Sequence, residues 1–249
     1  MRTIDDLVRD RTTDRRGGAV RQEPLDAYLA RADHGSASAL QRSLHTPGQT
    51  AALRIEDDPS QRLARALHAL VLEPARFARE YLVLDRDAPA PSGDEQPDAL
   101  TGRAWLASGE YAALVAARDA IRAYPRAPLG RWLDAGMKEL SIYWTDHAGR
   151  RWKARPDCFT DELVLELKTT GDVRPRAFAR TRRRFGYDLK AAHYVDAVRH
   201  LTGRTPRFAF VAVELAAPHY VWLHELSTAE LARAGVELAT ARSRFERAG

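Results

Sequence analysis

The segment Leu163–Lys168 constrains this chain most, because it alternates leucine with other side chains in the manner of a strand. Side chains two apart on a strand share a face. Glu166 and Lys168 therefore project together, and the leucines take the opposite side. Asp157 lies a short turn earlier, so we expect its carboxylate close to Glu166 across a hairpin. Two carboxylates that can hold a divalent cation, with an ammonium beside them, are what hydrolysis of a phosphodiester requires.

Composition sets looser limits. The 249 residues are enough to bury a substantial core, and 39 Lys and Arg against 34 Asp and Glu give a net charge of +5. That charge permits a polyanionic partner without demanding one. The single cysteine, Cys158, excludes an internal disulfide and fits a reducing compartment. The first residues lack the apolar segment of a signal peptide, and no apolar run is long enough to span a membrane, so we expect a cytoplasmic protein.

The chain divides into a leader and one α/β domain. Residues 1–24 are polar and arginine-rich, which predicts a disordered leader or a partner-binding arm. Residues 25–249 form the domain, with a helical N-terminal part over 25–135 and a catalytic core over 136–249. Residues 85–100, rich in proline and acids, are expected to form a surface loop.

The hydrophobic period changes to two after Gly136. It predicts a strand through Leu140, Ile142 and Trp144, a hairpin turn over 146–149 and a returning strand over 150–157. The strand with Glu166 follows at once, so we expect a three-stranded meander. A helix over 187–201, strands over 208–213 and 220–224 and a final helix complete a mixed central sheet flanked by helices.

A basic segment follows the acidic pair. Six arginines stand in the eleven residues from 174 to 184, with no acid among them: Arg174, Arg176, Arg180, Arg182, Arg183 and Arg184. Most charge runs are solvated helix faces. This run carries one sign only and comes directly after the acidic pair, and guanidinium groups bind phosphate oxygens in pairs. We therefore predict DNA-phosphate contacts for these arginines. Arg155, Lys190 and Tyr194 are further candidates for contact with DNA, and the role of the last two depends on the family resemblance given below.

Several segments together resemble the exonuclease VIII (RecE-like) branch of the PD-(D/E)xK nuclease superfamily, which also contains lambda exonuclease and the RecB nuclease domain. The matching segments cover roughly residues 28–240 in the right order. They are residues 34–38, 66–74, 153–157, 165–170, 185–187, 191–194 and 211–214. The resemblance implies a restriction-endonuclease-like PD-(D/E)xK core.

The resemblance also implies roles for single residues. A lone histidine on an apolar helix is usually a hydrogen-bonded core residue, but His68 matches a histidine of the family's metal site. Asp157 would be the central metal ligand, with Glu166 and the Leu167 carbonyl beside it. Oxygen ligands with one imidazole suit Mg²⁺, for which Mn²⁺ can substitute. Lys168 would orient the attacking water. The structural alternative for Asp157, Glu166 and Lys168 is a salt bridge at a strand edge, which the resemblance makes much the weaker interpretation.

Two positions fit the family less closely. Lys190 stands where the family usually has glutamine, and an ammonium reaches a phosphate without offering an acceptor. Glu139 shares the expected strand face of Ser141 and Tyr143, which could point either to the site or to solvent.

The function implied is that of a metal-dependent deoxyribonuclease. By resemblance it would be a Mg²⁺-dependent 5′→3′ exonuclease on double-stranded DNA ends. It would form a ring-shaped trimer or tetramer, act with a single-strand annealing protein and serve phage-type or prophage-type homologous recombination. One alternative is an endonuclease or nickase of the same fold, in DNA processing or defence. Another is a nuclease-inactive DNA-binding subunit, against which the intact Asp157, Glu166 and Lys168 argue.

Overall fold

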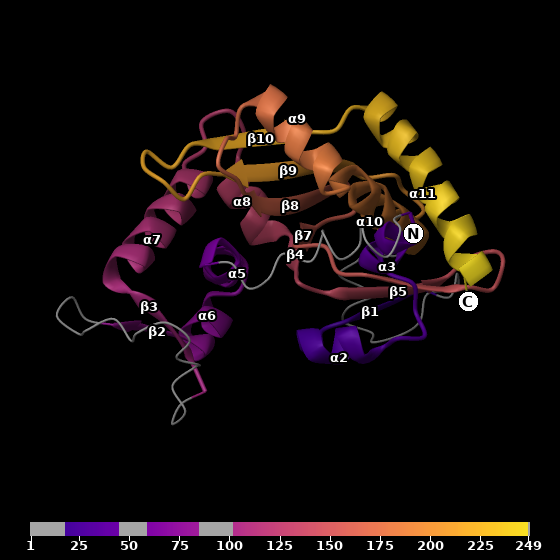
Figure 1. Cartoon of the computed structure of the whole chain (residues 1–249), viewed down its shortest axis with the longest axis horizontal. Coiled ribbons are helices and arrows are strands. Elements are labelled where there is room, and N and C mark those ends of the chain that lie inside the picture. The colour runs from indigo at the N-terminus through magenta and orange to yellow at the C-terminus, as the bar shows by residue number, and fades with distance from the viewer. Residues whose placement is uncertain (1–17, 45–58, 85–101, 249) are drawn as a thin grey trace.

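The computed structural model describes residues 18–44, 59–84 and 102–248 (Figure 1). The helices within these ranges are α2 (Leu25–Ala30), α3 (Ala37–Ser43), α5 (Pro59–Leu72), α6 (Pro74–Glu80), α7 (Ser108–Arg122), α8 (Leu129–Ala135), α9 (Pro175–Arg184), α10 (Tyr187–Thr202) and α11 (Thr228–Ala248). The strands are β1 (Ala19–Arg21), β2 (Tyr81–Leu84), β3 (Ala104–Ala107), β4 (Met137–Lys138), β5 (Ser141–Thr145), β6 (Arg151–Ala154), β7 (Cys158–Phe159), β8 (Leu163–Thr169), β9 (Arg207–Val213) and β10 (Val221–Glu225).

The largest sheet has five strands in the order β10-β9-β8-β7-β4. Only β8 and β9 run parallel in it, with Glu166 opposite Phe210, and the other neighbours are antiparallel. A second sheet has the order β1-β5-β6, and β2 pairs with β3 in a parallel pair. This mixed architecture, with helices around the sheets, confirms the predicted fold class.

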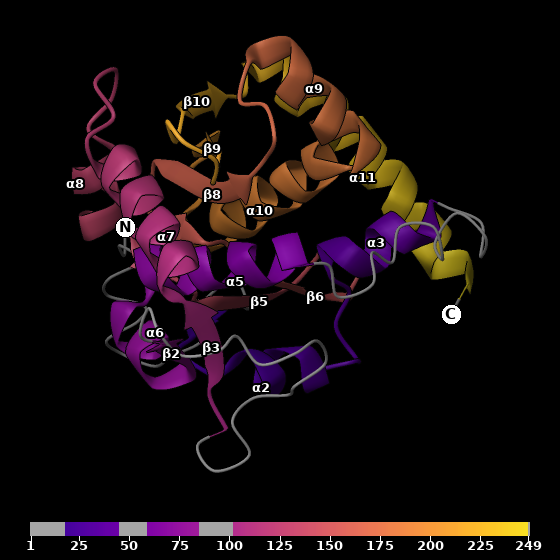
Figure 2. The same cartoon turned by 60° about the vertical axis from the view of Figure 1, so that its left-hand side comes forward.

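Strand β8 contributes to two hydrophobic cores. Val164 packs in one core with Phe178 of α9 and Phe210 of β9. The leucines at 163, 165 and 167 pack in the other, with residues of α5 and α7. Helices α9, α10 and α11 accordingly lie on one side of β8 and β9, and α5 and α7 lie on the other (Figure 2). The alternation in the sequence thus reflects burial on both faces.

The predicted three-stranded meander is wrong. β5 and β6 do form the predicted hairpin, but β6 ends at Ala154 and lies in a different sheet from β8. The antiparallel neighbour of β8 is the two-residue strand β7, where Cys158 faces Leu165. Pro156, which has no amide hydrogen to donate, precedes Asp157 where the chain leaves one sheet for the other.

The N-terminal segment is anchored to the core. Ala19–Arg21 pair with β5, so the predicted disorder of residues 1–24 is wrong for this part, and residues 1–17 lie outside the described residues. Lys153 of β6 donates to the carbonyl oxygens of Tyr28 at 2.7 Å and Arg31 at 2.8 Å, which satisfies the end of α2. The predicted loop over 85–100 also lies outside the described residues.

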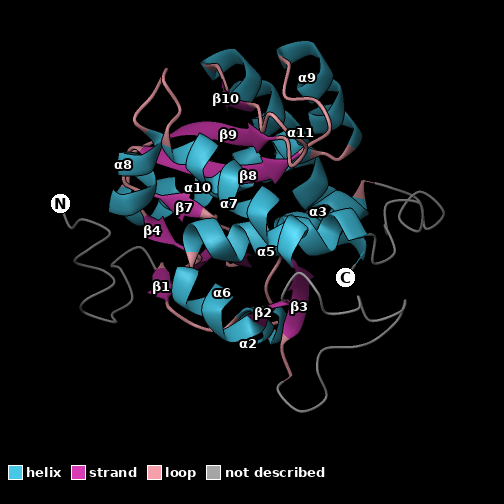
Figure 3. Ribbon diagram, turned by 90° about the vertical axis from the view of Figure 1, so that its left-hand side faces the viewer, coloured by secondary structure: helices cyan, strands magenta, loops and turns pink. Residues whose placement is uncertain are grey.

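Helix α5 runs between the five-stranded sheet and the β2–β3 pair (Figure 3). It begins at Pro59, a residue suited to a first helical turn, and ends before Pro74 opens α6. Leu67 and Leu70 of α5 are buried, and His68 between them is partly exposed. None of the helices in the described ranges has the length and apolar character needed to cross a membrane.

Candidate active site

Strand β8 places Glu166 and Lys168 side by side. The Glu166 side chain is fully buried, and Lys168 Nζ donates to its Oε1 at 2.6 Å. The ammonium of Lys190, which reaches the same oxygen from α10, lies 2.5 Å away. Two cations therefore share one carboxylate oxygen.

Asp157 contacts the backbone of β8. Its Oδ2 accepts a hydrogen bond from the Leu167 amide at 2.7 Å and lies 3.5 Å from His68 Nδ1 on α5. The Leu167 carbonyl, which the resemblance offered as a metal ligand, accepts from Lys168 Nζ at 3.2 Å. The structure thus brings together His68, Asp157, Glu166, Leu167 and Lys168 from three separate parts of the chain.

Glu139 lies in the site. The sequence alone did not decide whether its side chain points to the site or to solvent. Its φ of 52° ends the pairing of β4 before β5 begins, and its amide donates to the Asp157 carbonyl at 3.1 Å. Its carboxylate accepts from Arg155 Nε at 2.9 Å. Ligand atoms of Glu139, His68 and Asp157 all lie within 4.8 Å of one another. Glu166 is not part of this triplet.

Burial and neighbouring charges shift the pKa values of the site. Burial raises the pKa of Glu166, but Lys168 and Lys190 outweigh it and lower that pKa to about 2. Burial and the nearby Glu166 carboxylate raise the pKa of Asp157, and burial with Asp157 raises that of Glu139 to about 7. Burial lowers the pKa of His68 despite the adjacent Asp157, which keeps the ring neutral, as metal binding requires.

The donor set fits a divalent cation. Carboxylate oxygens with one neutral imidazole are ligands for Mg²⁺ or Mn²⁺. The two acids of the triplet have raised pKa values, because burial and a neighbouring carboxylate disfavour their charged forms. The second oxygen of Glu166, Oε2, is buried and has no hydrogen-bond partner among the described residues. Such an acceptor is available to a metal ion or a water molecule.

The structure separates the predicted DNA-contacting residues into two groups. Arg155 is buried and donates to Glu139, to Ser141 Oγ at 2.9 Å and to the Glu23 carbonyl at 3.0 Å. Arg182 is buried between Asp188 and Glu230, at 2.7 and 3.1 Å. Both guanidinium groups are held inside the protein, so the prediction that they contact DNA is not supported.

The other members of the predicted set differ in exposure. The exposed ones lie at or on α9, and they are Arg174, Arg176, Arg180, Arg183 and Arg184. Tyr194 is buried, and Lys190 Nζ lies 5.1 Å from the centre of its ring. Tyr194 therefore packs against Lys190 inside the protein and does not face solvent.

Comparison with known proteins places this geometry in a family. The model of the family described as "PDDEXK-like domain of unknown function (DUF3799)" matches residues 37–247. No curated protein sequence matches significantly. Among solved structures, one called "Putative exonuclease" from Eubacterium rectale shares the fold, with a TM-score of 0.61 at 15% identity, over 91% of this chain and 86% of that chain. An alkaline exonuclease from Laribacter hongkongensis is 14% identical over 90% of this chain and 93% of its own, but with a TM-score of 0.34 it is too distant in structure to compare. The chain belongs to the family of PDDEXK-like domains of unknown function (DUF3799), within the PD-(D/E)xK nuclease superfamily.

Proposed function

We propose that the protein is a metal-dependent deoxyribonuclease that acts as a 5′→3′ exonuclease on double-stranded DNA ends. The observation that carries the proposal is the convergence of His68 from α5, Asp157 before β7 and the Glu166–Lys168 pair of β8 on one buried cluster. Exposed arginines along α9 supply cations for the DNA backbone.

Each residue has a part in this proposal. His68, Asp157 and Glu139 would hold Mg²⁺, and the unpartnered oxygen of Glu166 and the Leu167 carbonyl are further candidate ligands. The ion, when bound, polarises the phosphate and activates water. Lys168 donates hydrogen bonds toward the attacking water and offsets charge on the phosphate oxygens. Lys190 helps to keep Glu166 ionised. Lys168 donates two of its three ammonium hydrogens to Glu166 and the Leu167 carbonyl, which leaves one for the attacking water.

The exonuclease habit, the polarity and the assembly follow from the resemblance to the RecE-like branch. The proposal therefore includes a ring-shaped trimer or tetramer, a single-strand annealing protein as partner and a role in phage-type recombination. The structure called "Putative exonuclease" has the same fold, which is compatible with this habit.

Two DNA substrates test the proposal. End-labelled linear duplex and covalently closed circular DNA are each incubated with Mg²⁺ or with EDTA. We expect loss of the linear duplex from its 5′ ends in Mg²⁺, an intact circle, and no cleavage in EDTA. Nicked or linearised circles would show an endonuclease, and intact linear DNA would show a binding subunit.

The catalytic assignment needs its own variant. Lys168→Ala should lower the rate of cleavage by at least about a hundredfold, because the variant loses the donor that stabilises developing charge. Lys138→Ala is the matched control, since this half-buried lysine on β4 donates only to backbone carbonyls at 3.4 Å. Equal rates for Lys168→Ala and wild type would refute the assignment.

A further inference from the structure

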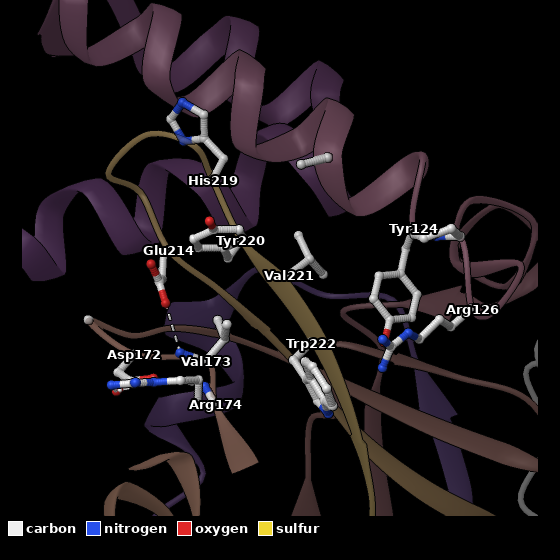
Figure 4. A pocket seen from close by; sticks show the side chains of 13 residues that line it. Tyr124, Arg126, Asp172, Val173, Arg174, Glu214, His219, Tyr220, Val221 and Trp222 are labelled. Atoms are coloured by element: carbon white, nitrogen blue, oxygen red, sulfur yellow. Dashed lines mark hydrogen bonds and ion pairs between the residues drawn. The ribbon is translucent and has the colours of Figure 1, made fainter. Parts of the chain in front are cut away.

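A cavity of about 770 Å³ opens at the end of β8, beyond the catalytic residues (Figure 4). It is lined by the turn Gly171–Arg174 after β8, by Glu214 after β9, by Ala120 of α7 with the segment Tyr124–Arg126 that follows this helix, and by His219–Trp222, which lead into β10. We call it the Trp222 cavity. None of the residues assigned to catalysis or metal binding lines it.

Aromatic rings form one wall of the Trp222 cavity. Trp222 lies on β10 and Tyr220 directly precedes this strand, and both side chains line the cavity. Tyr220 is 59% exposed, which is unusual for a large aromatic side chain in a folded protein. The Arg126 guanidinium carbon lies 4.8 Å from the centre of the Trp222 ring. Such flat surfaces of aromatic rings and guanidinium groups stack on nucleobases.

The charged groups of the wall favour a base over a bare phosphate. Asp172 and Glu214 both line the cavity, and their negative charge opposes a phosphate inside it. Asp172 is ion-paired with Arg174 at 2.6 Å, and Glu214 accepts from the Val173 amide at 2.9 Å. The Arg174 side chain is 82% exposed at the rim of the cavity, where it can contact the backbone of a DNA strand. The cavity therefore has an aromatic wall and an exposed arginine at its edge.

Position along β8 connects the Trp222 cavity to the catalytic cluster. Gly171 follows Lys168 by three residues, so their Cα atoms are at most roughly 11 Å apart. The neighbouring strand β9 runs parallel, with Ala212 opposite Lys168, and leads directly to Glu214 in the cavity wall. A strand of DNA at the catalytic cluster would thus have this cavity within reach of an adjacent nucleotide.

We propose that the Trp222 cavity binds a nucleobase of single-stranded DNA next to the reacting phosphate. The base stacks on Trp222 and Tyr220, and Arg126 and Arg174 lie beside the sugar-phosphate backbone of the bound strand. The inference deepens the proposed nuclease function and rests on it for the identity of the strand.

The test measures binding without catalysis. A fluorescein-labelled oligo-dT and an oligonucleotide of the same length built from abasic sites are titrated with the protein in EDTA, and anisotropy is recorded. Wild type should bind oligo-dT more tightly than the abasic strand. Trp222→Ala should weaken oligo-dT binding by about five- to a hundredfold, the usual range for one lost base–aromatic stack, and leave binding of the abasic strand unchanged.

Two further variants guard the interpretation. Tyr220→Ala removes an exposed ring and should show the same base-dependent loss even if Trp222→Ala folds poorly. Arg233→Ala, which removes an exposed arginine of α11 outside the cavity, should bind both strands as wild type does. Equal affinity of wild type for the two strands, or no loss in Tyr220→Ala and Trp222→Ala, would overturn the proposal.

Additional measurements separate this proposal from the proposed function and identify the source of the base. Normal duplex cleavage without base-dependent binding would refute only the proposal that the Trp222 cavity binds a base. Base-dependent binding without cleavage would refute only the proposed nuclease activity. Displacement of oligo-dT by equimolar dTMP would assign the site to a base on a free nucleotide. Resistance to dTMP would assign it to the strand.

Discussion

Lys190 on α10 donates to Oε1 of Glu166 on β8 at 2.5 Å, where the fully buried carboxylate already holds Lys168. The usual glutamine of related nucleases would bring no charge to this position. Here the carboxylate faces two ammonium groups, and its low pKa reflects both. The arrangement keeps Glu166 ionised in a place where burial alone would protonate it.

This coupling predicts a non-additive effect on stability. Glu166→Gln should lower the free energy of unfolding in EDTA by roughly 3 kcal/mol, because Lys168 and Lys190 lose their common counter-charge. The double variant Glu166→Gln, Lys190→Gln should recover part of that loss, since one of the two uncompensated cations is gone. Urea unfolding followed by circular dichroism measures both. Strict additivity of the single variants would mean that the two side chains do not interact.

Glu139 should contribute to metal affinity. Its carboxylate belongs to the triplet with His68 and Asp157, so Glu139→Gln should weaken binding of Mn²⁺ by at least about tenfold, as measured by calorimetry. Glu237→Gln, an exposed position on α11, serves as the control. Unchanged Mn²⁺ affinity in Glu139→Gln would show that Glu139 does not bind the metal and that its carboxylate serves only as the ion-pair partner of Arg155.

Arg180 and Arg182 lie on one helix but should behave differently. Arg180 is exposed, so Arg180→Ala should weaken DNA binding and reduce the slope of log K against log salt by about 1, with no change in stability. Arg182→Ala should lower the free energy of unfolding by roughly 2 kcal/mol, because Asp188 and Glu230 lose their buried partner. Salt titrations of DNA binding and urea unfolding distinguish the two. A loss of salt dependence in Arg182→Ala without loss of stability would contradict its internal role.

His193 should make the fold sensitive to acid. The ring is fully buried between Trp144 and Trp152, and its Nε2 lies 3.0 Å from the Lys153 carbonyl oxygen. Burial lowers its pKa from 6.5 to about 4, so the unfolded chain binds a proton that the folded one does not. Stability is therefore fully present above pH 6.5 and falls as the pH drops toward 4, by roughly 3 kcal/mol in total. His193→Gln should flatten this dependence of the urea midpoint, and His147→Gln, an exposed control, should keep it.

Cys158 should be chemically silent in the folded protein. Its side chain is buried, and burial raises the pKa of its thiol to about 12. We expect no reaction with Ellman's reagent in native buffer and one thiol per chain in denaturant. Rapid reaction of the native protein would show that β7 opens.

The sequence was informative where one strand carries its own pattern. The alternation at β8 predicted correctly which side chains share a face, because each face packs against a separate core. It could not reveal β7, whose two residues are too few to show a period, and the meander prediction failed there. Glu139 depends on a left-handed backbone turn that alternation does not register.

The arginine run shows a second limit. Arg180 and Arg182 look alike in sequence, and the second is buried between Asp188 and Glu230, the latter 48 residues further on. Partners so distant along the chain leave no periodic signal. The Trp222 cavity escaped notice for the same reason, since its walls come from segments that lie far apart in the sequence.

The double burial of β8 has a consequence for how the molecule opens. Its central amides are hydrogen-bonded between β7 and β9, and its side chains belong to both cores. Partial opening of either core leaves the strand held by the other, so its amides should exchange with solvent only when the whole domain unfolds. The cluster around Glu166 would then persist through local fluctuations that free the surrounding helices, and a partly opened molecule could still present its reactive groups in order.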